Sequence, residues 1–528
     1  MNNIKVFIAD DVNEDKLAPL REAGFEVVKE TKLTPEKLAE RIEDADGVIV
    51  RSATKITADL MDKAEKLRVI GRAGVGVDNI DVKAATERGI VVMNAPDGNT
   101  ITTAEHTIAL LVSMARNVPQ AHALLQSGEW DKKQFVGVEL HGKTLGIIGL
   151  GRIGGHVAKI AKGFGLSILA FDPFVSNEQA KDLGVEVGTL EDIFKKADFI
   201  TIHTPITDDT RGIIGKKAFS NMKKGVRVIN CARGGLIDEA ALLEAIENGT
   251  VAGASLDVFA VEPLPTDSPL LNNPKIITTP HLGASTTEAQ EGVALTVAEQ
   301  MRDYLLTGEL RGAVNAPSMA AKDLEAFQPF IDLAEKLGRF QAQVMYENPI
   351  SKVTLEFAGE LAGRDASSVT RAFLAGLLRD VSARVNVVNA LHIADERGIQ
   401  ITTSYTQSKR SSYDIRTIVS SAQTEQIASG MLFTGGEGRI TEIGNFSIEV
   451  VPSGFMLLTK NKDVPGVIGK IGTLLGEAKV NISRFYLGRE AKGGEALAII
   501  EIDSPLEEKV LADLRNLEAV NVARQVKL

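Results

Sequence analysis

The first hundred or so residues alternate short apolar runs with amphipathic helical stretches. The apolar runs cover residues 4–10, 46–52, 67–74 and 90–96. Runs of this length are typical of buried strands, and an intervening helix lets consecutive strands pair in parallel. The pattern therefore predicts one α/β unit built on a parallel sheet.

The same alternation resumes after a helical stretch at residues 103–117. Apolar runs suited to strands follow at residues 144–148, 167–172, 199–205, 226–235, 253–263 and 275–281. A further helical stretch spans residues 288–306, and Asn315-Ala316-Pro317 has the composition of a linker. These segments predict a second, doubly wound α/β unit.

Beyond residue 317 the pattern is α+β. Helical stretches at 324–345 and 368–381 and strand-like stretches at 351–359, 413–421 and 445–451 predict a module of unknown role. From residue 455 to residue 528 the order is β-α-β-β-α-β, which is typical of a ferredoxin-like domain.

Composition narrows the class of protein. A length of 528 residues exceeds what one core supports, and a net charge of −11 argues against a nucleic-acid partner. The single cysteine, Cys231, and seven histidines without paired spacing predict a cytoplasmic protein without a metal site. The sequence has neither a signal-peptide pattern nor an apolar run of about 18 residues, so we expect no contact with a membrane.

The first chemical question concerns the pattern G-x-G-x-x-G at Gly149, Gly151 and Gly154. The pattern alone is weak evidence, because 48 of the 528 residues are glycine. Here, however, an apolar run precedes it and an apolar helical face from Ile153 to Phe164 follows. Glycines at such a strand-to-helix turn let a pyrophosphate approach the N–H groups at the helix start.

Asp172 ends the next predicted strand. It follows Gly149 at close to the spacing of about 20 residues that is typical of a dinucleotide-binding motif. A carboxylate at this place can accept hydrogen bonds from the adenosine ribose and would repel a 2′-phosphate. The sequence therefore predicts that the cofactor is NAD rather than NADP.

Reactive side chains follow the later strands, where ligands of open α/β sheets bind. Arg233 lies between a buried strand and two glycines and is suited to hold a carboxylate through two parallel N–H bonds. His281 with Glu262 would form an imidazole–carboxylate pair that fixes the ring and favours its charged form. An isolated histidine at a strand end is usually structural, but Arg233 and Glu262 favour a proton acceptor for a hydroxyl group.

The motifs GLGRIG, HTP, NCARGGLIDE, LDVFAVEP and TPHLGAST resemble those of the D-2-hydroxyacid dehydrogenases, as do RSATKITADL, RAGVGVDNID and NAPDGNT. The C-terminal extension makes the chain similar to the long members of that family, which oxidise D-3-phosphoglycerate. The resemblance implies a flavodoxin-like substrate-binding domain at 1–98 and 287–317 and a Rossmann NAD-binding domain at 99–286. It also implies an intervening α+β domain at 318–452 and a ferredoxin-like ACT regulatory domain at 453–528.

The resemblance implies a role for each matching residue. Arg233 would bind the substrate carboxylate, His281 would take the C2 hydroxyl proton as hydride passes to NAD, and Glu262 would orient His281. The expected cofactor contacts are Gly149, Gly151, Arg152, Ile153, Gly154, Asp172, Thr204, Cys231, Asp257 and Gly283. The expected contacts to the substrate phosphate are Arg51, Ser52 and Arg72.

Two residues of the C-terminal domain resemble the family's effector loop. Asn481 can donate to a carboxylate and accept from an ammonium group, and Asp463 would cap the following helix. L-serine is the expected effector, although both residues can also serve only as caps and turns. In the intervening domain, Lys409, Arg410 and Arg439 are candidates for anion binding, but a solvated charged surface is the simpler interpretation.

The leading hypothesis is the NAD-dependent oxidation of D-3-phosphoglycerate to 3-phosphohydroxypyruvate, the first step of phosphorylated L-serine biosynthesis. A glyoxylate or hydroxypyruvate reductase would share every catalytic group but would need no phosphate site. A non-catalytic NAD-sensing protein would keep only the fold, and the joint presence of Arg233, Glu262 and His281 argues against it. Because ACT domains commonly pair across subunits, we expect a homotetramer or homodimer.

Overall fold

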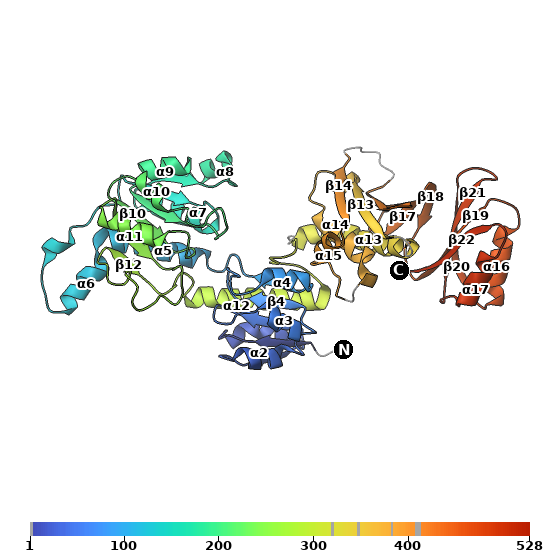
Figure 1. Ribbon diagram of the computed structural model, residues 1–528, viewed down its shortest axis with the longest axis horizontal. Coiled ribbons are helices and arrows are strands. Elements are labelled where there is room, and N and C mark those ends of the chain that lie inside the picture. Colours follow the sequence, from blue (N-terminus) through green and yellow to red (C-terminus); the bar gives the residue numbers. More distant parts are fainter. Residues whose placement is uncertain (1–3, 318–320, 346–348, 382–383, 407–412) are drawn as a thin grey trace.

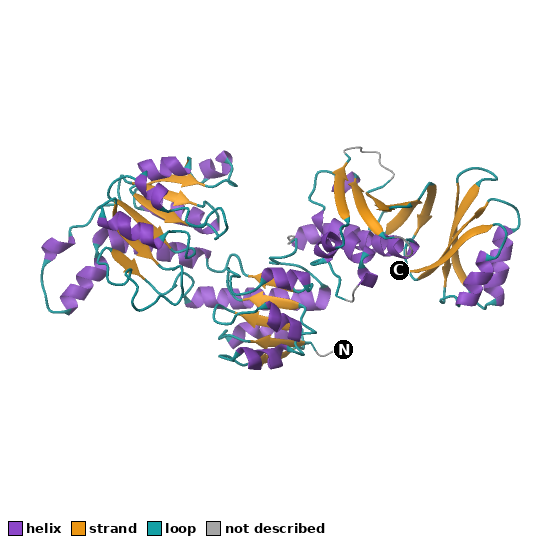
Figure 2. Ribbon diagram, viewed as in Figure 1, coloured by secondary structure: helices purple, strands orange, loops and turns teal. Residues whose placement is uncertain are grey.

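The computed structural model describes residues 4–317, 321–345, 349–381, 384–406 and 413–528. Four sheets follow one another along this chain, each with its own helices (Figures 1 and 2). Lys409 and Arg410 lie outside the described residues. None of the described helices combines the length and the apolar character that crossing a membrane requires.

The first unit is a parallel sheet in the order β2-β1-β3-β4-β5, which is the flavodoxin-like order. Its strands are β1 (Lys5–Ile8), β2 (Glu26–Lys29), β3 (Gly47–Val50), β4 (Val69–Arg72) and β5 (Val91–Asn94). Its helices are α1 (Ala18–Glu22), α2 (Pro35–Ile42), α3 (Ala58–Lys63), α4 (Val82–Glu87) and α12 (Thr287–Thr307). Strand β2 was not predicted, because it is a half-buried edge strand with a charged residue at each end.

Helix α12 brings the chain back to the first unit. Its buried apolar residues pack in the same cluster as residues of β1, β3, β4 and β5. The segment that follows also belongs to this sheet, because Met93 of β5 bridges Ala313 and the backbone N–H of Val92 donates to the side chain of Asn315 (2.9 Å). Asn315 was expected in a linker, and the structure instead ties it to β5.

The second unit is a parallel sheet in the order β12-β11-β10-β9-β6-β7-β8, the doubly wound order of a Rossmann fold. Its strands are β6 (Thr144–Ile148), β7 (Ser167–Phe171), β8 (Glu186–Val187), β9 (Phe199–Ile202), β10 (Val226–Asn230), β11 (Val251–Leu256) and β12 (Ile276–Thr278). Its helices are α5 (Thr100–Arg116), α6 (Val118–Gln126), α7 (Arg152–Gly163), α8 (Asn177–Asp182), α9 (Leu190–Lys196), α10 (Lys216–Ser220) and α11 (Glu239–Glu247). Among the strands only the two-residue β8 was not predicted, whereas of the helices only α5 and α7 were predicted by residue range.

Helix α6 and the loop after it project from the second unit (Figure 1). No residue of α6 is buried. Trp130 and Val136, in the loop that leads to β6, are 83% and 82% exposed. Side chains of this kind are normally covered in a finished assembly.

The third sheet is mixed, in the order β14-β13-β15-β16-β17-β18, with only β13 and β14 paired in parallel. Its strands are β13 (Ile350–Phe357), β14 (Gln400–Tyr405), β15 (Ile415–Ser421), β16 (Glu425–Leu432), β17 (Gly438–Ile443) and β18 (Phe446–Val450). The accompanying helices are α13 (Ala321–Val344), α14 (Ser367–Leu377) and α15 (Ala390–Glu396). Strands β14, β16 and β17 and helix α15 were not predicted.

The fourth sheet is antiparallel, in the order β20-β21-β19-β22. Its elements are β19 (Phe455–Lys462), α16 (Val467–Glu477), β20 (Ile482–Arg489), β21 (Glu495–Ile502), α17 (Glu508–Arg515) and β22 (Val520–Lys527), in the predicted order. One face packs on α16 and α17. Residues of the other face, including Leu458 and Ile499, share a hydrophobic core with the third sheet.

Candidate active site

The glycine turn between β6 and α7 has the geometry of a dinucleotide cradle. Gly149 has a φ of +93°, and a Cβ on it would lie 2.6 Å from the carbonyl oxygen of His203. A Cβ on Gly154 would lie 2.0 Å from the carbonyl oxygen of Gly149, so only glycine lets α7 pack against the turn. A Cβ on Gly151, by contrast, would meet no heavy atom within 4 Å. The first and third glycines thus shape the turn, and the second presents open backbone to a pyrophosphate.

Asp172 follows β7 and is fixed beside this turn. One carboxylate oxygen accepts a hydrogen bond from the N–H of Leu150 and the other from the N–H of Phe174, both at 2.8 Å. Each oxygen keeps a lone pair with which it can accept from a ribose hydroxyl. The carboxylate is therefore placed as an NAD-specific site requires.

Helix α7 begins with a charged residue, Arg152, and an apolar residue, Ile153. The Nε of Arg152 lies 2.6 Å from a carboxylate oxygen of Asp97, an exposed ion pair between the turn and the segment before α5. Ile153 packs against the core of the second unit. Its expected contact with the pyrophosphate can therefore come only from its backbone.

Thr204 and Cys231 lie at the ends of β9 and β10. The hydroxyl of Thr204 is buried and finds no hydrogen-bond partner in the described part of the chain, and the Thr204 side chain borders Gly149. An unpaired buried hydroxyl beside the glycine turn fits a cofactor that would supply the partner. Burial raises the pKa of the Cys231 thiol to about 12, so Cys231 presents a neutral side chain to this region.

Asp257 holds the loop that carries His281. It is fully buried, and one carboxylate oxygen accepts from the Thr279 hydroxyl (2.6 Å) and the other from the N–H of Gly283 (2.8 Å). Burial pushes the pKa of Asp257 upward, but hydrogen bonds from His106, Thr279 and the Leu282 N–H outweigh it and hold the pKa below its usual value. These bonds assign Asp257 and Gly283 to loop geometry, and their expected contacts with the nicotinamide stay predictions.

His281 and Glu262 form the expected pair. The Nδ1 of His281 lies 2.8 Å from Oε2 of Glu262, whose Oε1 accepts from the N–H of Phe259 (3.0 Å). His281 has a φ of +54°, an unfavourable conformation for a side chain of this size, and its N–H donates to the carbonyl oxygen of Asp257 (2.9 Å). Because Nδ1 is paired with Glu262, Nε2 is the ring nitrogen that remains for a ligand.

Arg233 follows β10, the strand next to β11, which precedes Glu262. The strands β10, β11 and β12 are neighbours, and Arg233, Glu262 and His281 follow them in turn. The two loops also touch, because a Cβ on Gly234 would lie 1.8 Å from the carbonyl oxygen of Phe259. The structure thus brings the three expected catalytic residues to one edge of the second sheet.

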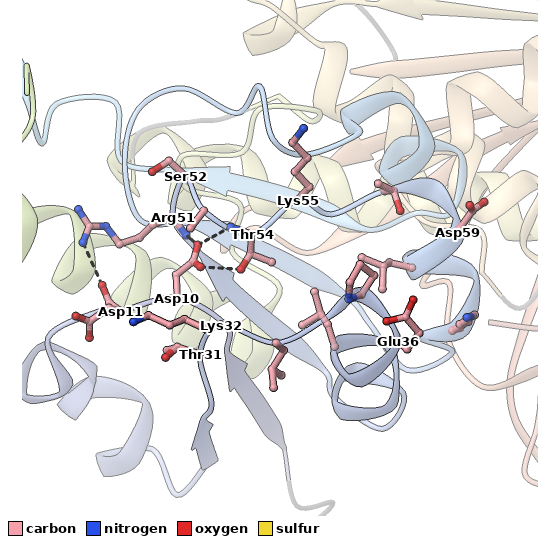
Figure 3. A pocket seen from close by; sticks show the side chains of 17 residues that line it. Asp10, Asp11, Thr31, Lys32, Glu36, Arg51, Ser52, Thr54, Lys55 and Asp59 are labelled. Atoms are coloured by element: carbon pink, nitrogen blue, oxygen red, sulfur yellow. Dashed lines mark hydrogen bonds between the residues drawn. The ribbon is translucent and has the colours of Figure 1, made fainter. Parts of the chain in front are cut away.

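The expected phosphate contacts lie at the carboxyl ends of β3 and β4 in the first unit. Arg51 and Ser52 line a hollow of about 810 Å³, and Nη1 of Arg51 donates to the carbonyl oxygen of Asp11 (3.1 Å) (Figure 3). Arg72 lies over Gly74, where a Cβ would come within 1.4 Å of Nη1. Burial, together with the neighbouring guanidinium groups of Arg233 and Arg51, lowers the pKa of Arg72 to about 10. Two guanidinium groups, those of Arg233 and Arg51, thus act on Arg72 at the cleft.

Sequence reasoning missed several residues of this site. Gln290 of α12 lines a second hollow of about 240 Å³ together with Arg51. The N–H of Arg233 Nε donates to Asp78 of the first unit (3.0 Å). His106 lies 3.2 Å from Asp257. The signal for His106 was available, since it shares a helical face with the buried Thr103 and Leu110.

The two expected effector residues lie at opposite ends of the fourth sheet. Strands β19 and β20 both pair antiparallel with β21, and Ile502 faces both Phe455 and Ile482. Asn481, which precedes β20, is therefore separated from Asp463, which follows β19, by about the length of an eight-residue strand, roughly 25 Å. One small amino acid cannot contact both within one chain.

The expected cap by Asp463 is also wrong. Helix α16 begins at Val467 with Gly466 as its N-cap. The Asp463 carboxylate instead accepts from the N–H of Gly493 (3.1 Å) and from Arg489 (3.4 Å). Asn481 donates to the carboxylate of Asp503 (2.8 Å). Arg439, the described member of the expected anion site, pairs with Glu437 and Glu449.

Comparison with known families covers three parts of the chain. Residues 108–283 match the NAD-binding domain of the D-isomer specific 2-hydroxyacid dehydrogenases. Residues 326–444 match the intervening domain of D-3-phosphoglycerate dehydrogenase, and residues 455–519 match the ACT domain.

Relatives match over the full length. The chain is 43% identical to a D-3-phosphoglycerate dehydrogenase from Bacillus subtilis over 99% of both proteins. It is 44% identical to one from Methanocaldococcus jannaschii, over 99% of this chain and 100% of that protein. The chain belongs to the D-3-phosphoglycerate dehydrogenase family. It is therefore an NAD-dependent 2-hydroxyacid dehydrogenase with an ACT domain.

Among solved structures, a glyoxylate reductase from Paecilomyes thermophila is 30% identical with a TM-score of 0.56. That likeness covers 60% of this chain and 99% of the reductase. This chain thus shares the fold of its dehydrogenase part with that reductase, and the remaining part of the chain has no counterpart in it.

Proposed function

We propose that the chain oxidises D-3-phosphoglycerate to 3-phosphohydroxypyruvate with NAD, as the first step of phosphorylated L-serine biosynthesis. The observation that supports it most directly is the combination of a His281–Glu262 pair and Arg233 on one side of the cleft with Arg51 and Arg72 on the other. A substrate that carries a carboxylate and a phosphate needs a cationic group at each end. The names of the full-length relatives point to the same substrate.

Each residue has a separate part in the reaction. The glycine turn of Gly149 and Gly151, together with Asp172, would hold NAD, which would supply the acceptor for the hydride of C2. His281 accepts the C2 hydroxyl proton at Nε2, while Glu262 holds the Nδ1 proton and offsets the charge that the ring gains. Arg233 holds the carboxylate, so that the C2 hydroxyl group faces His281. The product is the 2-oxo acid, and the proton leaves through His281.

The substrate phosphate is the feature that separates this function from the reduction of glyoxylate or hydroxypyruvate. Arg51 lines the hollow that Gln290 shares. Arg72 is half-buried, and among the described residues its buried Nε has no hydrogen-bond partner and its guanidinium has no ion pair. An unpartnered N–H on a partly buried guanidinium is costly unless an anion completes it. We assign the phosphate to this part of the cleft.

The test compares two acids that differ only in the phosphate. NADH production from D-3-phosphoglycerate and from D-glycerate is measured for the wild type, Arg51→Ala and Arg72→Ala, with Arg41→Ala as a control, because Arg41 makes an exposed ion pair with Glu30 in the same unit. We expect the first two variants to lose at least tenfold more kcat/KM for the phosphorylated acid. Equal losses for both acids would favour a reductase of small 2-oxo acids.

We further propose that the chain acts in the cytoplasm as a homodimer or homotetramer. The projecting helix α6 and the exposed Trp130 and Val136 support an interface between two copies at this place. Replacing Val136 with Asp should lower the molar mass measured by light scattering, and an unchanged mass would exclude this surface.

We propose the domain division 1–98 with 287–317, 99–286, 318–452 and 453–528, which the return of α12 to the first sheet supports.

Serine regulation would act at the last domain. Because Asp463 and Asn481 lie at opposite ends of their sheet, two copies paired antiparallel along β20 would bring one of each together. If serine inhibits the wild type, both Asp463→Ala and Asn481→Ala should lose the response, and retention in both would exclude these residues.

A further inference from the structure

Arg233 is held from three sides at the place where the first and second units meet. Its Nε donates to Oδ2 of Asp78 (3.0 Å) and its Nη1 to the carbonyl oxygen of Ala232 (2.7 Å). Its Nη2 lies against Gly76, where a Cβ would come within 2.0 Å. Two of these three neighbours, Asp78 and Gly76, belong to the first unit, although Arg233 belongs to the second.

The loop that carries Asp78 is itself firmly placed. The next residue, Asn79, donates through its side chain to the carbonyl oxygens of Arg51 (2.7 Å) and Thr54 (2.6 Å). Its own carbonyl oxygen accepts from the N–H of Ile56 (2.9 Å). The side chain of Asp78 is 65% exposed. Its backbone is held in place because the neighbouring Asn79 bonds to residues on both sides of the loop that follows β3. Asp78 therefore presents its carboxylate to Arg233 from a fixed position.

The bonds to Asp78 and Ala232 use two of the five N–H groups of Arg233. The described residues leave one N–H of Nη1 and both N–H groups of Nη2 for a ligand. A carboxylate binds a guanidinium in a planar, two-pronged geometry, so rotation of the guanidinium plane about the Cγ–Cδ and Cδ–Nε bonds decides where the ligand lies. Asp78 fixes that rotation.

Charge strengthens the same contact. The guanidinium group of Arg233 lies close enough to Arg72 to lower the pKa of Arg72, whereas Asp78 and Asp10 act on Arg72 in the opposite sense. Without Asp78, repulsion from Arg72 would favour rotation of the Arg233 side chain out of the cleft. The ion pair with Asp78 thus counters the repulsion between Arg233 and Arg72 while the site is empty. Once bound, the carboxylate and phosphate of the substrate would counter the same repulsion.

We propose that Asp78 is a positioning residue, which orients Arg233 from across the cleft so that its free N–H groups receive the carboxylate of the substrate. The inference rests on the role of Arg233 in the proposed function. It follows that the carboxylate site is complete only when both units are in place, because the first unit supplies the group that orients the arginine of the second.

The experiment uses the full chain and compares Asp78→Ala, Asp78→Asn and Asp62→Ala. Asp62 is a matched control, because it makes an ion pair with Arg88 in the first unit, away from the cleft, and its side chain is 58% exposed. Two reactions are followed for each protein, the oxidation of D-3-phosphoglycerate and the reduction of glyoxylate with NADH. Glyoxylate carries the carboxylate and the carbonyl group but no phosphate.

For Asp78→Ala we expect KM to rise about tenfold for both acids, as the loss of one charge-assisted contact implies, with kcat changed less than about threefold and KM for the cofactor unchanged. Asp78→Asn should raise KM less than Asp78→Ala does, because its amide oxygen still accepts a hydrogen bond from Nε of Arg233. Asp62→Ala should leave both KM values unchanged. A merely structural ion pair would lower the melting temperature of both alanine variants alike and would leave KM alone.

Other outcomes would overturn the inference. A fall in KM would mean that Asp78 competes with the substrate for Arg233, and a rise for the phosphorylated acid alone would place its effect at the phosphate. If Asp78→Ala matches Asp62→Ala while the wild type oxidises D-3-phosphoglycerate, the inference fails and the proposed function stands. If the wild type fails on that substrate but the glyoxylate KM still responds to Asp78, the proposed function fails and the inference stands.

Discussion

The Nδ1 of His281 lies 2.8 Å from Oε2 of Glu262, and the other oxygen of that carboxylate accepts from the N–H of Phe259. Both oxygens of Glu262 are thereby fixed, so the carboxylate can orient the ring. A carboxylate accepts hydrogen bonds and does not donate them when ionised, so the proton of the neutral imidazole stays on Nδ1. Nε2 then carries the lone pair that a general base requires.

Removing either member of this pair should slow the chemical step. We expect His281→Asn to lose about 10²- to 10⁴-fold in kcat, and Glu262→Gln to lose a smaller factor because the ring keeps its Nε2. Binding of NADH, measured by its fluorescence, should be unchanged in both. His392→Asn is a suitable control, since His392 pairs with Glu396 outside the site, and a loss in kcat of the same size in that variant would refute the assignment.

The glycines of the turn should respond differently to the same substitution. A Cβ on Gly154 would collide with the backbone of Gly149, whereas a Cβ on Gly151 would meet open space. We expect Gly154→Ala to lower the melting temperature by several degrees. Gly151→Ala should melt as the wild type does and should raise KM for NAD at least tenfold, because the methyl group would occupy the path of the pyrophosphate. Equal melting and equal KM in the two variants would contradict the assigned roles.

Asp172 should set the choice between the two dinucleotides. Asp172→Asn keeps an oxygen to accept from the N–H of Leu150 but removes the charge that repels a 2′-phosphate. We expect the ratio of kcat/KM for NAD to that for NADP to fall at least tenfold, mainly through improved use of NADP. If the ratio is unchanged, a group other than Asp172 determines the specificity.

The sequence indicates those parts of the site that depend on local chemistry. Gly149, Gly151 and Gly154 could be predicted because a strand, a tight turn and a helix follow one another along the chain. Arg233 and His281 could be predicted because each follows an apolar strand, and adjacent parallel strands end at one edge of their sheet. The same periodicities predicted two α/β units, an α+β module and a β-α-β-β-α-β domain, whereas the flavodoxin-like, intervening and ACT assignments came from the resemblance to a family.

The remaining features depend on contacts between distant segments. Asp78 meets Arg233 only because the two units face each other, and no spacing in the sequence encodes that approach. The separation of Asp463 and Asn481 follows from strand order, since the motif that suggested them says nothing about which end of the sheet each occupies. Strand β14 escaped prediction because most of its side chains are exposed, so it lacks an apolar pattern.

His203 should make the stability of the second unit depend on pH. Burial lowers the pKa of His203 from its usual value near 6.5 to about 4, so the folded protein keeps this ring neutral. The unfolded chain takes up a proton below pH 6.5, and the native state is therefore destabilised as the pH falls from 6.5 towards 4, by about 1.4 kcal/mol per unit. His203→Gln removes this pH-dependent destabilisation, because glutamine does not titrate. Its side-chain amide can still form a hydrogen bond with the Thr201 hydroxyl. Calorimetry at pH 8 and pH 5 should show the melting temperature of the wild type falling further than that of the variant, and parallel decreases would show that His203 is already protonated in the native state or exposed to solvent.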